Sequence, residues 1–336
     1  MTKPNLERLE QEYDTFVREH PTLESDIRFA LEDCVSDAGI AYDRVDTRIK
    51  SWRSFAAKAA KCDEDSSLLY PHPWEQITDV VGARIITYHS TEIPRVIKTL
   101  EQMFTVLRSV DKAAETRISG GFGYGSHHLI VQVTEETEDL ESYAGLVFEV
   151  QLRTILQHAW AEFEHDIRYK GAGTGADPVI DRSFTLAAGL IELADQEFDQ
   201  IAHVRADSHP VAGNVPLTDG NLPHVLTLML GDRFPRSKSE VYPWLEEILT
   251  ANGVRTVADL EAITSPDDVA LVLDALQYQY VPSQVRLVDD LLLARFGPSH
   301  IARTGHSGYR PGRRPARLQR RLKKLQAKRK ADDERR

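Results

Sequence analysis

Residues 146–170 read LVFEVQLRTILQHAWAEFEHDIRYK and contain the most informative pattern in the chain. In the first half of this stretch every second residue is apolar: Leu146, Phe148, Val150 and Leu152. The residues between these, from position 149 on, are polar: Glu149, Gln151 and Arg153. A period of two predicts a strand with one buried face and with a carboxylate, an amide and a guanidinium on the other.

From residue 156 the same stretch changes to the period of a helix. Its apolar residues recur at helical spacing: Leu156, Trp160, Phe163 and Ile167. A polar stripe runs nearly opposite to them: His158, Glu162, His165 and Tyr169. We expect an amphipathic helix directly after the strand. The strand taken alone is equally compatible with an ordinary solvated sheet face.

The composition is that of a globular protein with room for one large or two modest domains. Of the 336 residues, 41% are hydrophobic and 28% are charged. No apolar run is long enough to span a bilayer, and the polar N-terminus predicts no signal peptide. The two cysteines, Cys34 and Cys62, have no metal-type spacing, so we expect a reducing, cytoplasmic location and no zinc site.

Helices are also expected in the part of the chain before residue 62. Residues 5–40 predict two helices that are separated at Pro21-Thr22, and residues 41–61 predict a third helix rich in basic residues. On this third helix three residues would share one face at i, i+4 and i+8: Lys50, Ser54 and Lys58. Further elements are expected at helix 92–104, strand 105–110, strand 129–133 and helix 183–201.

Residues 79–88, DVVGARIITY, predict a buried strand that carries two charged residues, Asp79 and Arg84. Buried charges need a partner or a ligand. Strict alternation would place Asp79 and Arg84 on opposite faces. Either Asp79 lies just ahead of the strand, or Gly82 allows the strand to bend; the sequence leaves both alternatives open.

A loop with four glycines between positions 120 and 125 has neither the Walker nor the dinucleotide spacing. Its glycines flank the aromatic ring of Tyr124, which is suited to stacking on a base. Polar groups from elements that would meet across one mixed sheet complete the set: Asp79, Glu149, Gln151, Arg48, Lys50, Lys58, Arg84 and Arg153. Carboxylates hold Mg²⁺ and cations bind polyphosphate, so the set indicates phosphoryl-type transfer on nucleotides.

The composition changes after residue 206. Residues 207–223 are rich in Pro, Gly, Asn and His and predict a linker, and residues 224–300 predict a small helical accessory domain. Residues 301–336 carry 14 Lys or Arg against 3 Asp or Glu, on a chain of net charge −11. This basic tail is interpreted as a helix that contacts RNA, a ribosome or its own acidic body, or as a disordered arm.

Five segments in order resemble the synthetase domain of the RelA/SpoT family, across roughly residues 1–206. They are RIKSWRSFAAK (48–58), DVVGARI (79–85), GYGSHH (123–128), EVQLRT (149–154) and QHAWAEFEHDIRYK (157–170). The resemblance implies a nucleotidyltransferase-like α+β domain with a mixed sheet flanked by helices. It also implies a small alarmone synthetase, which transfers pyrophosphate from ATP to the 3′-hydroxyl of GTP or GDP with Mg²⁺, making pppGpp or ppGpp in the stringent response.

The resemblance also implies a role for each matching residue. Asp79 and Glu149 would bind the metal, and Glu149 would help activate the attacking hydroxyl. ATP would be bound by Arg48, Lys50, Ser54, Lys58 and Arg84. The acceptor would be bound by Tyr124, which stacks on guanine, and by Gln151, Arg153 and His158. His128 either shares in the site or only supports the fold.

Gly125 departs from the family pattern, which commonly has arginine after the Gly-Tyr pair. The change removes one cation beside the acceptor and, with the basic tail, keeps a second reading open: a toxic relative that transfers pyrophosphate to the 3′ end of tRNA. A non-catalytic nucleotide-binding regulator is a third reading, but both motif acids, Asp79 and Glu149, are present. A homo-oligomer is compatible with the resemblance.

Overall fold

The computed structural model describes residues 6–63, 66–112, 125–170, 178–204, 215–231, 233–308 and 312–333. The chain forms two compact units: unit 1 within Met1–Cys34 and Tyr42–Arg205, and unit 2 within Val35–Ala41 and Ala206–Arg336. The short segment Val35–Ala41 therefore belongs with the C-terminal part of the chain. Over the described ranges, no helix combines the length and the apolar character needed to cross a membrane.

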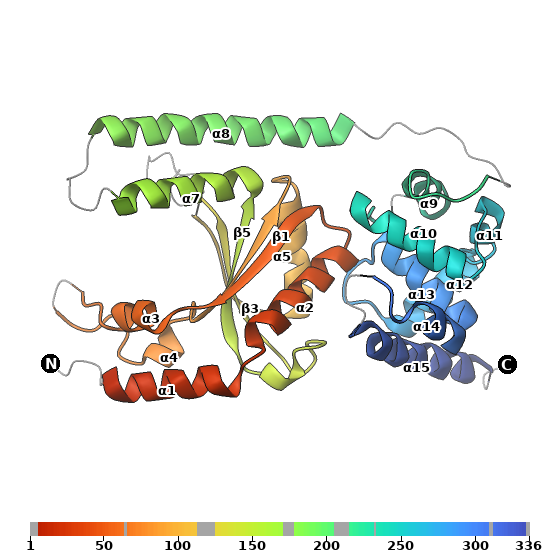
Figure 1. Ribbon diagram of the computed structural model, residues 1–336, viewed down its shortest axis with the longest axis horizontal. Coiled ribbons are helices and arrows are strands. Elements are labelled where there is room, and N and C mark those ends of the chain that lie inside the picture. The colour runs from red at the N-terminus through yellow and green to blue at the C-terminus, as the bar shows by residue number, and fades with distance from the viewer. Residues whose placement is uncertain are drawn as a thin grey trace. The chain divides into compact units, whose positions relative to one another are not determined.

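Unit 1 is built on a five-stranded mixed sheet in the order β1-β2-β5-β4-β3 (Figure 1). The strands are β1 (Tyr42–Ile49), β2 (Val81–Thr87), β3 (Thr105–Asp111), β4 (His127–Gln132) and β5 (Val147–Thr154). β2 and β5 are parallel, and every other neighbouring pair is antiparallel. The predicted α+β fold with a mixed sheet and flanking helices is confirmed.

The helices of unit 1 flank this sheet. They are α1 (Leu6–Glu19), α2 (Leu23–Asp37), α3 (Trp52–Ala59), α4 (Pro73–Gln76), α5 (Glu92–Met103), the 3₁₀ turn η1 (Glu141–Tyr143), α7 (Ile155–Lys170) and α8 (Pro178–Val204). α5 contacts β3 and β5, and Phe104 after it packs edge-on against Phe148 with ring centroids 5.4 Å apart. This apolar side leaves the polar residues of β5 on the other face of the sheet.

The predicted junction between strand and helix is confirmed at Thr154. Its backbone N–H donates to Gln157 Oε1 at 2.9 Å, and the Gln157 N–H donates to Thr154 Oγ1 at 3.1 Å. This reciprocal pair satisfies donors at the start of α7, as a capping box does. Further along α7, Trp160 packs on Phe184 of α8, so that α8 runs beside α7 (Figure 1).

The prediction of one helix over residues 41–61 is wrong in its first half. Residues Tyr42–Ile49 form β1, and only Trp52–Ala59 are helical, as α3. Within β1, Val45 is buried while Arg44, Asp46 and Arg48 are exposed, which is the pattern of a strand. Lys50 consequently lies between the two elements and not on a helix face with Ser54 and Lys58.

The structure also decides between the two alternatives for Asp79. β2 begins at Val81, and Asp79 lies in the turn ahead of it. No bend at Gly82 is needed to bring Asp79 and Arg84 to one side, because Asp79 is outside the strand.

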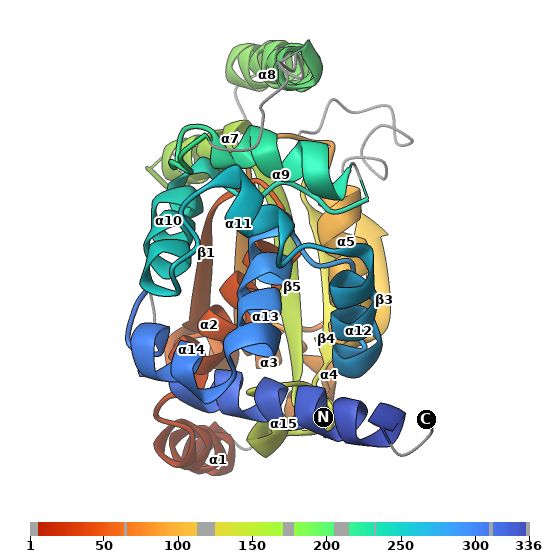
Figure 2. The same ribbon diagram turned by 90° about the vertical axis from the view of Figure 1, so that its right-hand side faces the viewer.

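Unit 2 is helical, as predicted for the region after the linker. It contains α9 (Leu222–Leu230), η2 (Ser239–Val241), α10 (Tyr242–Ala251), α11 (Val257–Glu261), α12 (Pro266–Leu276), α13 (Gln284–Phe296), α14 (Pro298–Thr304) and α15 (Arg314–Asp333). The buried α13 contacts α9, α10, α12, α14 and α15 (Figure 2). The basic tail is thus helical over Arg314–Asp333, and it packs through the buried Leu318 and Leu325.

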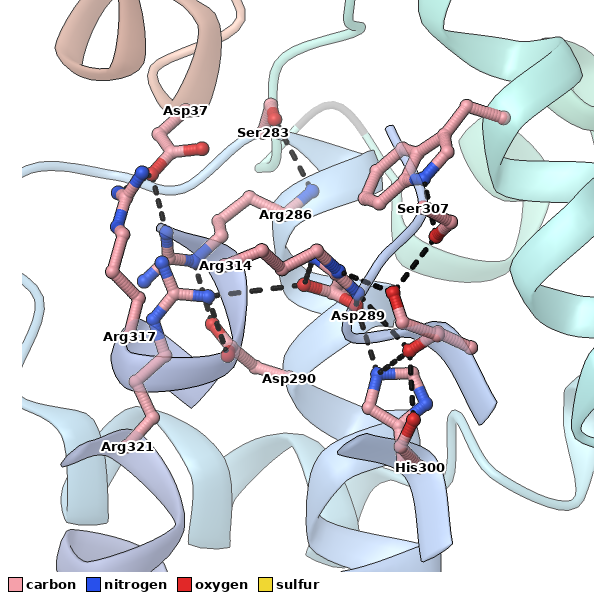
Figure 3. Close-up of polar contacts among 12 residues, drawn as sticks. Asp37, Ser283, Arg286, Asp289, Asp290, His300, Ser307, Arg314, Arg317 and Arg321 are labelled. Atoms are coloured by element: carbon pink, nitrogen blue, oxygen red, sulfur yellow. Dashed lines mark hydrogen bonds and ion pairs between the residues drawn. The ribbon is translucent and has the colours of Figure 1, made fainter. Parts of the chain in front are cut away.

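Buried ion pairs join α15 to α13 (Figure 3). Asp289 receives two hydrogen bonds from Arg314, at 2.6 and 2.9 Å, and lies 3.0 Å from His300 Nε2. Asp290 lies 2.7 Å from Arg286 and 3.4 Å from Arg321. Arg286 also pairs with Asp37, at the end of α2. Several tail arginines therefore neutralise aspartates inside unit 2.

Candidate active site

The site lies on the polar face of the sheet, where β1, β2, β5 and β4 bring polar residues into register. One row across the sheet consists of Asp46, Arg84, Gln151 and His128. The next row consists of Arg48, Gly82, Glu149 and Ile130. Residues paired across adjacent strands project to the same side, so these two rows share one face.

Asp79 is held by two lysines at the edge of this face. Lys50 Nζ lies 2.8 Å from Asp79 Oδ2, and Lys58 Nζ lies 2.9 Å from Oδ1. Burial alone would raise the pKa of Asp79, but the hydrogen bonds and charges of Lys50 and Lys58 outweigh it and hold the pKa below its ordinary value. Asp79 is therefore an anion at neutral pH, with two ammonium groups beside it.

Glu149 is held by a chain of hydrogen bonds from β4. Ser126 Oγ lies 2.6 Å from His128 Nε2, and His128 Nδ1 lies 2.6 Å from Glu149 Oε1. Gln151 donates to the second carboxylate oxygen, Oε2, at 3.3 Å. Burial would raise the pKa of Glu149, as does the charge of Asp79, but the contacts with His128 and Gln151 lower it below its ordinary value. Glu149 is thus ionised and held in one orientation, and the negative charge of Asp79 acts on it.

Arg84 links the sheet to α7. Its Nη1 donates to Glu162 Oε1 at 3.0 Å and lies 3.3 Å from His158 Nδ1. On the other side of the ring, Arg44 Nη2 lies 2.7 Å from His158 Nε2. Burial and the charges of Arg84 and Arg44 lower the pKa of His158, while Glu162 opposes them. The imidazole therefore stays neutral at neutral pH between two guanidinium groups.

Arg153 continues the row of polar residues along β5. Its Nη2 donates to Gln151 Oε1 at 3.3 Å. Burial and the charge of Arg84 lower the pKa of Arg153 to about 10, with a smaller contribution from Arg48 and with Glu162 and Glu149 opposing. Guanidinium groups clustered in this way create a strongly positive surface, which suits a polyanionic ligand.

Most of the residues singled out from the sequence meet on this face. One group consists of Asp79, Lys50 and Lys58. A second group consists of Glu149, Gln151 and Arg153. Near Arg153 lie the remaining three residues: Arg48, Arg84 and His158. Ser54 lies on the exposed side of α3, where its hydroxyl accepts from Ser51 Oγ at 3.0 Å. Tyr124 falls outside the described residues, as does the rest of its loop over residues 113–124.

Three residues of the site were assigned no role from the sequence: Arg44, Ser126 and Glu162. Each contacts a predicted site residue or its partner. Glu162 lies one turn after His158 on the polar stripe of α7, so helical spacing could have indicated it. The roles of Arg44 and Ser126 depend on strand register, which local periodicity does not supply.

Asp79 and Glu149 are the residues of this face that would hold a divalent cation. Within the described ranges, no three or more His, Cys, Asp or Glu side chains are gathered as a complete metal site. Mg²⁺ is usually held by one or two carboxylates together with substrate phosphates and water. Asp79 and Glu149 are both ionised, and the charge of Asp79 acts on Glu149, so this pair of carboxylates fits that pattern of binding.

Residues 47–174 match the family model described as "Region found in RelA / SpoT proteins". GTP pyrophosphokinase YjbM of Bacillus subtilis is 31% identical over 135 residues, which are 39% of this chain and 60% of that protein. GTP pyrophosphokinase YwaC of the same organism is 31% identical over 126 residues, 37% of this chain and 57% of that protein. The chain therefore spans about three fifths of the length of these curated relatives.

Two solved structures are also similar. Small alarmone synthetase 1 from Bacillus subtilis, bound to its product pppGpp, is 24% identical with a TM-score of 0.48, covering 59% of this chain and all of that one. A GTP pyrophosphokinase family protein from Streptococcus pneumoniae is 21% identical with a TM-score of 0.46, covering 57% of this chain and 93% of that one. Residues 47–174 of this chain are thus similar to the region found in RelA/SpoT proteins and to two curated GTP pyrophosphokinases.

Proposed function

We propose that this protein is a GTP or GDP pyrophosphokinase that transfers the β,γ-pyrophosphate of ATP to the 3′-hydroxyl of the guanosine nucleotide. The main support for the proposal is that two ionised carboxylates lie beside several cationic side chains on one face of the sheet. Asp79 is bonded to Lys50 and Lys58, and Glu149 to His128. The curated relatives named GTP pyrophosphokinase support the choice of reaction.

In this reaction the bond that forms joins the acceptor 3′-oxygen to the β-phosphorus of ATP. The bond that breaks joins the β-phosphorus to the oxygen that bridges it to the α-phosphorus, and AMP leaves. Glu149 orients the hydroxyl and takes its proton, because it is ionised and held in place by His128. Mg²⁺ bound by Asp79 and Glu149 would neutralise phosphate charge and polarise the transferred group.

The cations of the face supply binding and charge neutralisation. Lys50 and Lys58 are placed to exchange part of their contact with Asp79 for the phosphates of ATP. Arg48 and Arg84 would flank the adenine, as the resemblance implies, and Arg153 and His158 would contact the acceptor nucleotide. Phosphoryl transfer depends mainly on such positioning and electrostatic stabilisation.

Transfer to the 3′ end of tRNA is the second candidate, and the surface of α15 favours it. While Arg314 and Arg321 face Asp289 and Asp290, other basic residues of α15 are exposed: Arg320, Lys323, Lys324, Arg329 and Lys330. An exposed basic helix face suits RNA or a ribosome. Its affinity for RNA should fall steeply with salt.

The remaining proposals concern the setting of the enzyme. We propose a cytoplasmic location, which the free thiols of Cys34 and Cys62 fit. A role in the stringent response follows from the proposed synthesis of pppGpp or ppGpp. Self-association is proposed through α8, where Leu186, Leu190 and Leu193 are exposed at helical spacing. Light scattering of wild type and Leu190→Glu tests that surface.

The experiment that tests the function offers ATP labelled in its β- and γ-phosphates to the purified protein with Mg²⁺. GDP, GTP and deacylated tRNA are supplied in separate reactions. Label on the guanosine nucleotide is the expected result. Label on tRNA alone would replace the first candidate with the second, and label on none of the three would refute both.

A further inference from the structure

Gly82 leaves a gap in the polar face of the sheet. It lies in register between Arg48 of β1 and Glu149 of β5, and Arg84 follows it on the same side of β2. These three neighbours carry long polar side chains, whereas Gly82 has none. The gap therefore lies within the charged face, next to a carboxylate and two guanidinium groups.

Neither the backbone nor the packing of the described residues explains a glycine here. A Cβ built at Gly82 would meet no other atom of the described chain within 4 Å, and its φ is outside the left-handed region. At Gly39, by contrast, a Cβ would lie 2.6 Å from the carbonyl oxygen of Arg236, and φ is +65°. Gly39 is required by its surroundings within the protein, and Gly82 is not.

A glycine inside a strand often marks a place where a ligand or another backbone approaches closely. Outside its own chain neighbours, no described backbone lies within 4 Å of the Cβ position of Gly82, which leaves the approach of a ligand as the reason for a glycine. The groups around the gap indicate what kind of ligand would fit there. The carboxylates of Glu149 and Asp79 suit a divalent cation, and the arginines suit the phosphates that accompany it.

We infer that Gly82 is a substrate-contact position, at which the polyphosphate of the bound nucleotide, with its cation, lies directly against the backbone of β2. The inference rests on the proposed nucleotide chemistry of this face and adds a steric requirement to it. A methyl group at position 82 would occupy the space that the phosphate chain needs. Misplacing a reacting group by about 1 Å can reduce the rate about 10²-fold.

The test compares Gly82→Ala and Gly82→Val with a matched control, Gly189→Ala. Gly189 lies in α8 of the same unit, and a Cβ there also meets nothing within 4 Å. Binding of a non-hydrolysable ATP analogue with Mg²⁺ is measured by calorimetry, together with the melting temperature and the transfer rate. We expect Gly82→Ala to melt at or above the wild-type temperature and to lose roughly 10²-fold in kcat/KM, with Gly82→Val losing more.

The control variant should bind and turn over as the wild type does. Unchanged analogue affinity and kcat/KM in Gly82→Ala would overturn the inference, and so would a large fall in its melting temperature, since the protein itself would then need the glycine. If the wild type binds the analogue but transfers nothing to a guanosine nucleotide, the proposed function fails. Weaker analogue binding by Gly82→Ala would in that case still support the inference, and equal binding would overturn it.

Discussion

Asp289 holds helix α15 in its packed position in unit 2, and its replacement by asparagine should destabilise the packing of that helix. The side chain is 3% exposed and faces Arg314, Arg321 and His300. Asp289→Asn keeps the shape but removes the charge. The guanidinium group of Arg314 then loses the hydrogen bond to Oδ2, at 2.9 Å, and the carboxylate charge that strengthens the bond to Oδ1, at 2.6 Å, while it stays mostly buried.

The magnitude follows from the burial of the pair. Removing one partner of a buried ion pair costs about 3–5 kcal/mol, because the other charge is left uncompensated. The ion pair between Asp274 and Lys328 also joins α12 to α15, but the Asp274 side chain is 58% exposed. Exposed pairs contribute about 0–1 kcal/mol. Asp274→Asn is therefore a matched control at the same helix.

Hydrogen exchange of backbone amides in α13 and α15 measures this difference in the full-length chain. A loss of about 3–5 kcal/mol corresponds to a fall in protection of roughly two to three and a half powers of ten. The control should change protection by less than tenfold. Equal protection in the two variants would refute the argument that the buried network anchors α15.

The acid dependence of unit 2 supplies a second readout. Contacts with Arg314 and His300 outweigh burial and hold the pKa of Asp289 well below its ordinary value of 3.8. A carboxyl group with a lowered folded-state pKa stabilises the fold fully above its unfolded pKa, and that stability is lost as the pH falls through the folded pKa. Wild-type protection should therefore decline below about pH 4, and Asp289→Asn should lack this component.

Three further predictions concern the site. His128→Asn can keep a donor on Glu149 whereas His128→Gln can keep only the contact with Ser126, so steady-state kinetics should give the first variant roughly tenfold higher kcat; equal kcat values would argue against positioning. Tyr124→Ala should raise the acceptor KM more than it weakens ATP binding, and an unchanged acceptor KM would exclude stacking. Because contacts hold the pKa of both Asp79 and Glu149 below their ordinary values of 3.8 and 4.5, the acid limb of kcat against pH should lie below about pH 4.5, and a limb above about pH 5 would contradict those shifts.

The part of the fold with strong periodicity was predictable from sequence. The change from a period of two to a helical period at residues 146–170 located β5 and α7, since alternating burial reflects one covered sheet face. The period of β1 was misassigned, because Arg44 and Arg48, four residues apart, resemble a helical pair. In fact they are two strand residues on the same face, with Val45 buried behind them.

The contacts that complete the site and unit 2 depend on distant parts of the chain. His128 meets Glu149 only because β4 and β5 pair in one register, and Arg44 meets His158 across 114 positions. Arg286 contacts Asp37 across 249 positions. Local propensity carries no information on such pairings. The sequence could therefore suggest which groups act, but not which partner holds each of them.

The role of Glu149 in pyrophosphate transfer is tested by measuring transfer and ATP binding side by side in wild type and Glu149→Gln. Single-turnover reactions with labelled ATP, Mg²⁺ and a guanosine acceptor report the chemical step, and calorimetry with a non-hydrolysable ATP analogue reports binding. We expect Glu149→Gln to abolish transfer while its affinity for the ATP analogue stays close to that of wild type. Transfer at the wild-type rate in Glu149→Gln would contradict this role.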